Sequence, residues 1–233
     1  MFEDDKDGIS HLIEKELNST DKILKPDFSQ KAGREFLAFY LQSKFKQVLA
    51  YDAKTPEPIF KEVSYDFIQK FSKRLISNPE KKIMIGITGE SASGKTTICR
   101  TIASAITLFN MPVTILTTDN YFNDISDLIK KYGSFDALRD NGYDVDSPES
   151  FQLDILKEDL EKISHGEDIY SPEYLPNGTG VSVPKSRLVP SKKVVVVEGM
   201  ASMYKDIKDI FDIKVYIETD IDVRKDWFMK RAY

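Results

Sequence analysis

The hydrophobic pattern of this chain changes at about residue 82. From there on, short unbroken apolar runs, typical of strands buried in a parallel sheet, alternate with segments of helical spacing. The expected strands are Ile83–Ile87, Pro112–Thr118, Lys193–Glu198 and Asp212–Glu218. The expected helices are Thr97–Ile106, Ser147 to about Ile163, and Asp222–Tyr233. This alternation predicts an α/β fold, in which a parallel sheet is flanked by helices on both faces.

Residues 1–81 have a different pattern. Apolar residues recur at helical spacing in Ile9–Asn18, Gly33–Ala50 and Val63–Ile76, and the prolines of Thr55–Pro58 separate the last two. We therefore predict a helical amino-terminal extension over residues 1–81, followed by an α/β domain over residues 82–233. The apolar stripes of the extension are expected to pack on one another and on that domain, and a separate role in binding a partner stays open.

Composition narrows the class of protein. The chain of 233 residues is 41% hydrophobic, which is enough for a globular core, and its net charge of -5 argues against nucleic acid as its main partner. The sequence contains no apolar run near the ~20 residues that cross a bilayer, and the acidic amino terminus does not resemble a secretory signal. We expect a soluble cytoplasmic protein without a membrane partner, and homo-oligomerisation stays open.

The few cysteines and histidines give little sign of metal or redox chemistry. Cys99 is the single cysteine, so it cannot form an internal disulfide, and we expect it to be a small core residue. His11 and His165 are far apart and have no cysteine neighbours, which argues against a zinc site.

A phosphate-binding loop follows the first expected strand. The segment Gly89–Thr96 reads GESASGKT and fits G-x-x-x-x-G-K-[ST] at every fixed position. In such a loop the backbone amides surround a phosphate, Lys95 faces the β- and γ-phosphates, and the Thr96 hydroxyl is a ligand for Mg²⁺. The predicted nucleotide-binding residues are Gly89, Glu90, Ser91, Ala92, Ser93, Gly94, Lys95, Thr96 and Thr97. The fold is therefore expected to be of the P-loop NTPase type.

Two carboxylates stand at expected strand ends, where ligands gather in a parallel α/β sheet. Asp119 follows the second strand, and Glu198 ends the valine-rich strand. Glu198 is suited to hold Mg²⁺ directly or through water, together with Thr96. Asp119 is suited to accept a proton from a substrate hydroxyl, which makes Asp119 and Lys95 the candidate catalytic residues.

The same region resembles the uridine kinase, phosphoribulokinase and pantothenate kinase group of P-loop kinases. The resemblance covers roughly residues 82–233. The matching segments, in order, are the phosphate-binding loop, Thr118–Phe122 (TDNYF), Tyr143–Phe151 (YDVDSPESF), Pro172–Tyr174 (PEY), Val197–Gly199 (VEG) and Asp220–Arg224 (DIDVR).

This resemblance implies that ATP, with Mg²⁺, donates a phosphoryl group to a hydroxyl of a small molecule. Asp119 matches the general base of the family. Asp146 matches the acid that contacts the sugar hydroxyls of the acceptor, and Tyr174 matches an aromatic residue beside the acceptor. Arg224 matches a basic residue that meets the phosphates from the helix leading into the lid.

The sequence also departs from these relatives. After Tyr174, a stretch Leu175–Ser182 replaces the segment in which the family carries a histidine and an arginine, so a nucleoside, pantothenate or a sugar phosphate all stay open as acceptors. The chain is expected to end before or within the lid region. We therefore predict a kinase of a small metabolite with a nucleoside or sugar-type acceptor. The alternative is a catalytically weak nucleotide-binding module that regulates or scaffolds.

Overall fold

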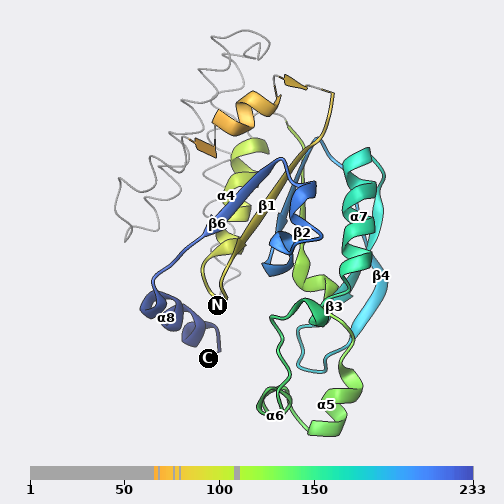
Figure 1. The fold of residues 1–233 in the computed structure, drawn as a ribbon, viewed down its shortest axis with the longest axis vertical. Coiled ribbons are helices and arrows are strands. Elements are labelled where there is room, and N and C mark those ends of the chain that lie inside the picture. Colours follow the sequence, from red (N-terminus) through yellow and green to blue (C-terminus); the bar gives the residue numbers. More distant parts are fainter. Residues whose placement is uncertain (1–65, 68, 76, 79, 108–110, 233) are drawn as a thin grey trace. The chain divides into compact units, whose positions relative to one another are not determined.

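The computed structural model describes residues 66–67, 69–75, 77–78, 80–107 and 111–232 (Figure 1). The chain divides into two compact units, residues 1–77 with 104–111 and residues 78–103 with 112–233. In the first unit, residues 66–67 and 69–75 are helical, in agreement with the pattern expected over 63–76. The helices expected over 9–18 and 33–50 lie outside the described residues. The domain boundary placed after residue 81 stays a prediction.

The second unit is built on a parallel sheet. Its strands are β1 (Ile83–Gly89), β2 (Val113–Thr117), β5 (Val194–Glu198) and β6 (Ile213–Ile217). They lie in the order β2–β5–β1–β6, and every neighbouring pair is parallel. All four strands expected from the apolar runs are confirmed to within two residues at each end.

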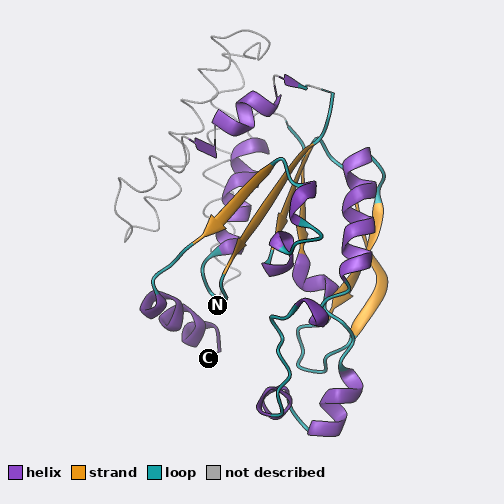
Figure 2. Cartoon of the chain, in the orientation of Figure 1, coloured by secondary structure: helices purple, strands orange, loops and turns teal. Residues whose placement is uncertain are grey.

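Alternate residues of the central strands face the two sides of the sheet, because the side-chain period of a strand is two. On one side, Met84, Val195 and Val197 form a hydrophobic cluster with the buried face of helix α7 (Leu153–His165). On the other side, Ile85 and Val196 are fully buried. Helix α4 (Lys95–Thr107) and α7 lie on opposite sides of the sheet (Figures 1 and 2), which confirms the predicted layers.

Four elements around this sheet were not predicted. They are α5 (Ser126–Tyr132), α6 (Phe135–Asp140) and an antiparallel hairpin of β3 (Ile169–Tyr174) and β4 (Ser182–Val189). Strand β4 is exposed at six consecutive residues, so it lacks the alternation of apolar and polar residues that marks a half-buried strand. The last helix, α8 (Ile221–Ala232), was expected.

The helix start expected at Ser147 is wrong. Residues Pro148–Ser150 form one short 3-10 turn, the side chain of Ser147 makes no capping bond there, and α7 begins only at Leu153. The reason is tertiary. Phe151 is extended and forms a bridge with Phe122, and the backbone N–H of Gln152 donates to the carbonyl of Tyr121 at 2.7 Å.

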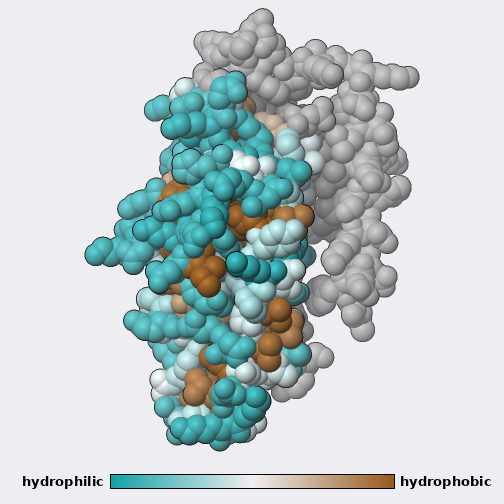
Figure 3. Space-filling view, turned by 90° about the vertical axis from the view of Figure 1, so that its right-hand side faces the viewer, coloured by the Kyte–Doolittle hydropathy of each residue, from teal (hydrophilic) through white to brown (hydrophobic). Residues whose placement is uncertain are grey.

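The surface is predominantly polar on the face that Figure 3 presents, where hydrophobic side chains form small separate patches. Large apolar side chains that are more than half exposed belong to the hairpin, to β6 and to α8: Tyr170, Leu188, Tyr216, Ile221, Phe228 and Met229. In the part of the chain that the structure describes, no helix has the length and hydrophobicity needed to cross a membrane.

Candidate active site

The phosphate-binding loop connects β1 to α4. Gly89 has φ +157°, and a Cβ added there would lie 2.4 Å from the carbonyl oxygen of Ile217, so no larger residue fits. The ammonium group of Lys95 donates to the carbonyl oxygens of Gly89 at 2.9 Å and of Glu90 at 2.8 Å. These bonds hold the lysine over the loop, where a polyphosphate chain would meet its charge.

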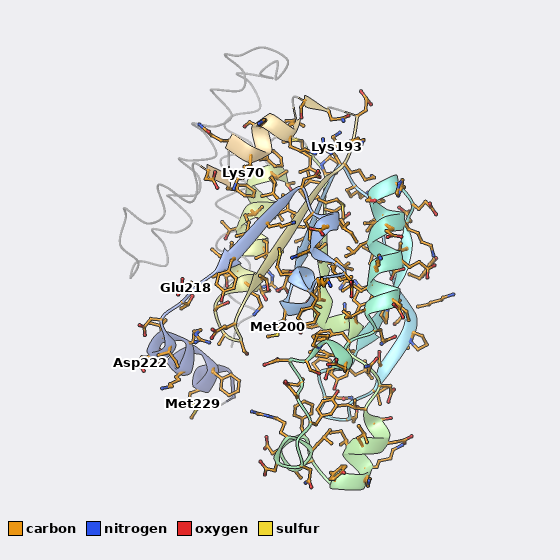
Figure 4. The ribbon with its side chains drawn as sticks, in the orientation of Figure 1. Lys70, Lys193, Met200, Glu218, Asp222 and Met229 are labelled. Atoms are coloured by element: carbon orange, nitrogen blue, oxygen red, sulfur yellow. The ribbon has the colours of Figure 1, made fainter. Side chains whose placement is uncertain are left out.

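The strand register brings Glu198 next to this loop. Strand β5 lies between β1 and β2, and Glu198 pairs in register with Ile87 on one side and Thr117 on the other. The Thr96 hydroxyl at the start of α4 donates to Glu198 Oε1 at 3.3 Å. Figure 4 labels Met200 and Glu218, which follow β5 and β6, at this same carboxyl-terminal edge of the sheet.

Asp119 lies in a short 3-10 turn, η1 (Thr118–Tyr121), directly after β2. Its backbone N–H donates to the Thr117 hydroxyl at 3.3 Å. Although the side chain keeps contact with solvent, the surrounding protein desolvates it and raises the pKa of the Asp119 carboxyl. Lys95 opposes this rise in pKa, and Asp146 adds to it. The two groups named as catalytic, Lys95 and Asp119, therefore interact through space.

Glu198 has a perturbed pKa as well. It is 7% exposed, and burial raises the pKa of its carboxyl; the charge of Asp119 raises it further, while bonds from Thr117 and Thr96 and the charge of Lys95 lower it. Titratable groups with shifted pKa values concentrate at functional sites, because the same burial and charge that shift them also prepare a site for reaction.

A glycine allows the two carboxylate-bearing segments to meet. Gly199, directly after Glu198, has φ +128°, and a Cβ there would lie 2.0 Å from the Thr118 hydroxyl oxygen and 3.3 Å from the Thr118 backbone nitrogen. Thr118 is fully buried and precedes Asp119. The close approach of these two backbones therefore sets the separation of Glu198 and Asp119.

The residues at this edge suit a magnesium ion. The Thr96 hydroxyl and the Glu198 carboxylate are hard oxygen donors, which Mg²⁺ prefers, and they already lie within hydrogen-bond distance of each other. Among the described residues, no group of three or more His, Cys, Asp or Glu side chains could hold a metal ion unaided.

Two residues expected on the acceptor side, Asp146 and Tyr174, lie near the segment that carries Asp119. Asp146 is close enough to raise the pKa of the Asp119 carboxyl. Tyr174, at the end of β3, packs on Phe122 with ring centroids 5.4 Å apart, and Phe122 stacks on Phe151 at 4.3 Å. Tyr204 meets the edge of Phe151 at 5.7 Å. These four rings, Phe122, Phe151, Tyr174 and Tyr204, form what we name the aromatic cluster.

The segment that carries Asp146 is fixed to this cluster and to its own backbone. The hydroxyl of Tyr204 donates to the Asp146 carbonyl at 2.5 Å, and the Asp146 N–H donates to the Asp144 carboxylate at 3.0 Å. Beside it lies a hollow that is lined mainly by acidic and polar residues, namely Asp136, Arg139, Asp140, Gly142, Tyr143, Asp144, Val145 and Asp146.

Arg224 lies at the phosphate-binding loop and not in this hollow. Its guanidinium forms an ion pair with Glu90, and its Nε donates to the Thr219 carbonyl at 3.1 Å. The Thr219 hydroxyl in turn donates to the Ser93 carbonyl at 2.9 Å. The start of α8 is thereby tied to the phosphate-binding loop at two points.

Sequence reasoning missed the pairing of Glu90 with Arg224, the contribution of Phe122, Phe151 and Tyr204, and the role of Thr117 beside Glu198. These contacts join segments far apart in the chain, so no local sequence pattern predicts them. Cys99, predicted to be a core residue, is fully buried and free, and burial raises the pKa of its thiol to about 12.

The parallel sheet and its phosphate-binding loop define a P-loop nucleotide-binding protein. A model of the phosphoribulokinase / uridine kinase family matches residues 84–232. This chain belongs to the phosphoribulokinase / uridine kinase family.

Among curated proteins, the chain is similar to the uridine kinase of Leuconostoc citreum, with 32% identity over 65% of this chain and 67% of the relative. It is 33% identical to the uridine kinase of Oceanobacillus iheyensis, over 62% of this chain and 65% of that protein. The match to uridine-cytidine kinase A of Dictyostelium discoideum, at 30% identity, covers 69% of this chain and 29% of the relative. The chain thus spans less than two thirds of several curated relatives.

A solved structure with the same fold comes from Silicibacter sp. TM1040 and is described as a candidate fructose transport system kinase. It has a TM-score of 0.58 at 18% identity and covers 70% of this chain and 78% of its own. At this identity the likeness concerns the fold alone.

Proposed function

We propose that this protein is an ATP-dependent phosphotransferase that phosphorylates a hydroxyl group of a small, uncharged metabolite of the nucleoside or sugar type. The observation that carries the proposal is the convergence of Lys95, Asp119 and Glu198 at one edge of the sheet. Glu198 pairs in register with the neighbouring strand ends that lead to the loop and to the Asp119 turn, and it accepts a hydrogen bond from the Thr96 hydroxyl. A phosphate-binding loop alone serves many activities, but a candidate base beside its lysine and a buried magnesium-type carboxylate suits transfer to an acceptor hydroxyl.

Each residue has a role in this proposal. The loop amides and Lys95 hold the phosphates of ATP, and Thr96 and Glu198 hold Mg²⁺, which neutralises charge on the phosphate oxygens when it is bound. Asp119 accepts the proton of the acceptor hydroxyl as that oxygen bonds to the γ-phosphorus and the bond to the ADP oxygen breaks. The raised pKa of the Asp119 carboxyl makes its carboxylate a better proton acceptor.

The acceptor side favours an uncharged molecule. The hollow beside Asp146 carries four aspartates and one arginine, so an anion such as a sugar phosphate would meet net repulsion there. Carboxylates such as Asp146 accept hydrogen bonds from sugar hydroxyls, and the aromatic cluster offers Tyr174 for contact with a ring. Arg224 forms its ion pair with Glu90 of the phosphate-binding loop, so in this proposal it supports the binding of ATP and not of the acceptor molecule.

The test is ADP formation from ATP and Mg²⁺ in the presence of uridine, cytidine, pantothenate, ribulose 5-phosphate or glycerate. We expect stimulation by an uncharged acceptor. Asp119→Asn should retain nucleotide affinity and lose transfer by roughly 10²–10⁴-fold, the range for one acid–base group. Asp127→Asn is the matched control, because Asp127 is a 94% exposed carboxylate on α5 and should leave turnover unchanged.

Two results would contradict the proposal. Turnover that is stimulated by pantothenate, ribulose 5-phosphate or glycerate, but not by uridine or cytidine, would show that the acidic hollow does not exclude anions. ATP binding without stimulation by any acceptor would instead indicate a nucleotide-binding module without kinase activity.

A further inference from the structure

A buried hydrogen bond joins the turn that carries Asp119 to helix α7. The hydroxyl of Tyr121, the last residue of η1, donates to Asp159 Oδ2 at 2.8 Å. Asp159 projects from the middle of α7, and the two side chains are 0% and 7% exposed. Nothing in the proposed chemistry uses either group, and a carboxylate in such a place is costly unless it is well paired.

The inner side of this pair packs against apolar side chains, while charged side chains at the surface act on Asp159. Tyr121 belongs to the hydrophobic cluster that includes Leu156 and Leu160 from α7. Asp159 shares the inward face of the helix with them. Burial raises the pKa of the Asp159 carboxyl, and the bond from Tyr121 opposes that rise. A hydrocarbon side chain would fill this position at lower cost, so an acid here is consistent with a directional contact.

The bond completes a set of attachments between η1 and α7. The backbone N–H of Gln152 donates to the Tyr121 carbonyl at 2.7 Å, and the Gln152 side chain donates to the Phe122 carbonyl at 2.7 Å. Both of these contacts hold the backbone at the carboxyl-terminal end of the turn. The Tyr121 hydroxyl adds an anchor about one side-chain length away, and two separated anchors resist rotation of the turn where one does not.

Orientation matters here because Asp119 is two residues before Tyr121 in the same turn. The Asp119 carboxylate must meet a hydroxyl group within about 3 Å to accept its proton. A turn that rocks about its backbone attachments would move the carboxylate by more than a proton transfer tolerates, since a misplacement of about 1 Å can cost on the order of 10² in rate.

We propose that the Tyr121–Asp159 hydrogen bond is a positioning contact, which fixes the turn η1 so that the Asp119 carboxylate faces the acceptor hydroxyl. This inference rests on the proposed function of Asp119. Tyr121 and Asp159 are positioning residues, because neither touches the reacting atoms.

The test compares four variants with the wild-type protein, using uridine as acceptor. Tyr121→Phe removes the hydroxyl and keeps the ring, and Asp159→Leu removes the acceptor. Both should lower kcat by about 10- to 100-fold while KM for ATP stays unchanged. Asp159→Asn keeps an oxygen that accepts the tyrosine bond and should restore kcat close to the wild-type value. Tyr170→Phe, at an exposed tyrosine on β3, is the control and should change neither parameter.

Stability is measured in parallel, because all changes at a buried site affect folding. If Tyr121→Phe lowers the melting temperature but keeps kcat at a temperature where it is fully folded, the pair is only structural and the inference is overturned. Equal loss of kcat in Asp159→Asn and Asp159→Leu would overturn it as well, because then the hydrogen bond is not what matters.

Asp119→Asn separates this inference from the proposed function. If Asp119→Asn transfers phosphate at the wild-type rate, the proposed function of Asp119 fails first. If it abolishes transfer and Tyr121→Phe does not impair it, the positioning inference alone fails. Should uridine not be phosphorylated, the pKa of the Asp119 carboxyl, followed by carbon-13 NMR, gives a second readout. It should change in Tyr121→Phe and not in Asp159→Asn, and an unchanged value in Tyr121→Phe would overturn the inference.

Discussion

Replacing Gly199 by alanine tests whether the contact between the ends of β5 and β2 sets the site. The added Cβ would lie 2.0 Å from the Thr118 hydroxyl oxygen and 3.1 Å from Thr118 Cβ, at a backbone φ of +128°. An unfavourable backbone conformation costs about 1–3 kcal/mol and overpacking of a buried contact costs about 1–3 kcal/mol. Together they amount to roughly 2–6 kcal/mol, a large part of the ~5–15 kcal/mol that stabilises a typical domain.

Two further variants divide this cost. Gly178 also has a positive φ, +75°, but an added Cβ there meets nothing within 4 Å, so Gly178→Ala should show the cost of a positive φ without a steric contact. The backbone cost at Gly199, with φ +128° and ψ 172°, should be at least as large. Thr118→Ala removes the oxygen at 2.0 Å, which has no hydrogen-bond partner among the described residues. Combined with Gly199→Ala, it should recover about 1–3 kcal/mol, the coupling expected of residues in contact.

The assay is denaturant unfolding of the wild-type protein, the three single variants and the double variant, with thermal melting as a check. At about 2–4 °C per kcal/mol for a chain of this size, Gly199→Ala should lower the melting temperature by at least about 4 °C. Gly199→Ala with wild-type stability, or a double variant that loses the sum of the two single losses, would refute the claim that these backbones meet so closely.

Three other predictions concern single side chains. Lys95→Ala should lose tight binding of ATP in a fluorescent-nucleotide titration, because the positive charge over the loop is removed; unchanged affinity would contradict the loop assignment. Glu198 has a raised pKa in the folded state, so its contribution to stability is present at low pH and is lost as pH rises through that pKa. Glu198→Gln should therefore raise the melting temperature more at pH 8 than at pH 4, and an equal gain at both would contradict the assigned burial. The Cys99 thiol, with its pKa raised by burial to about 12, should react with a thiol reagent at pH 8 only after unfolding, and rapid reaction of the native protein would show that the thiol is accessible.

The strands and the nucleotide loop could be predicted from the sequence because they depend on local patterns. A valine run such as Val194–Val197 is typical of a strand covered on both faces, and the loop motif requires its residues at fixed spacing. Helix α7 was predicted, but its start was not, since a long-range bridge between Phe151 and Phe122 keeps that stretch extended.

The position of Asp159 in the sequence predicts a buried acid on helix α7. Asp159 falls on the same helical stripe as Leu156, Leu160 and Ile163, so an acid was due on the buried face of α7. Periodicity indicates that this acid is buried, and a buried acid needs a hydrogen-bond partner. Periodicity does not indicate which residue is the partner. The partner, Tyr121, is 38 residues away and belongs to a different element.

The sequence by itself determined the kind of elements, the phosphate-binding loop and the acids at the strand ends, because each depends on a few neighbouring residues. Only the tertiary structure decided that β5 enters between β1 and β2, since strand order depends on the packing of whole faces. That order puts Glu198 beside Thr117 and near Asp119, and the glycine after it lets the two segments touch. The candidate catalytic and magnesium-binding residues lie in separate stretches of the chain, and the folded sheet brings them to one edge.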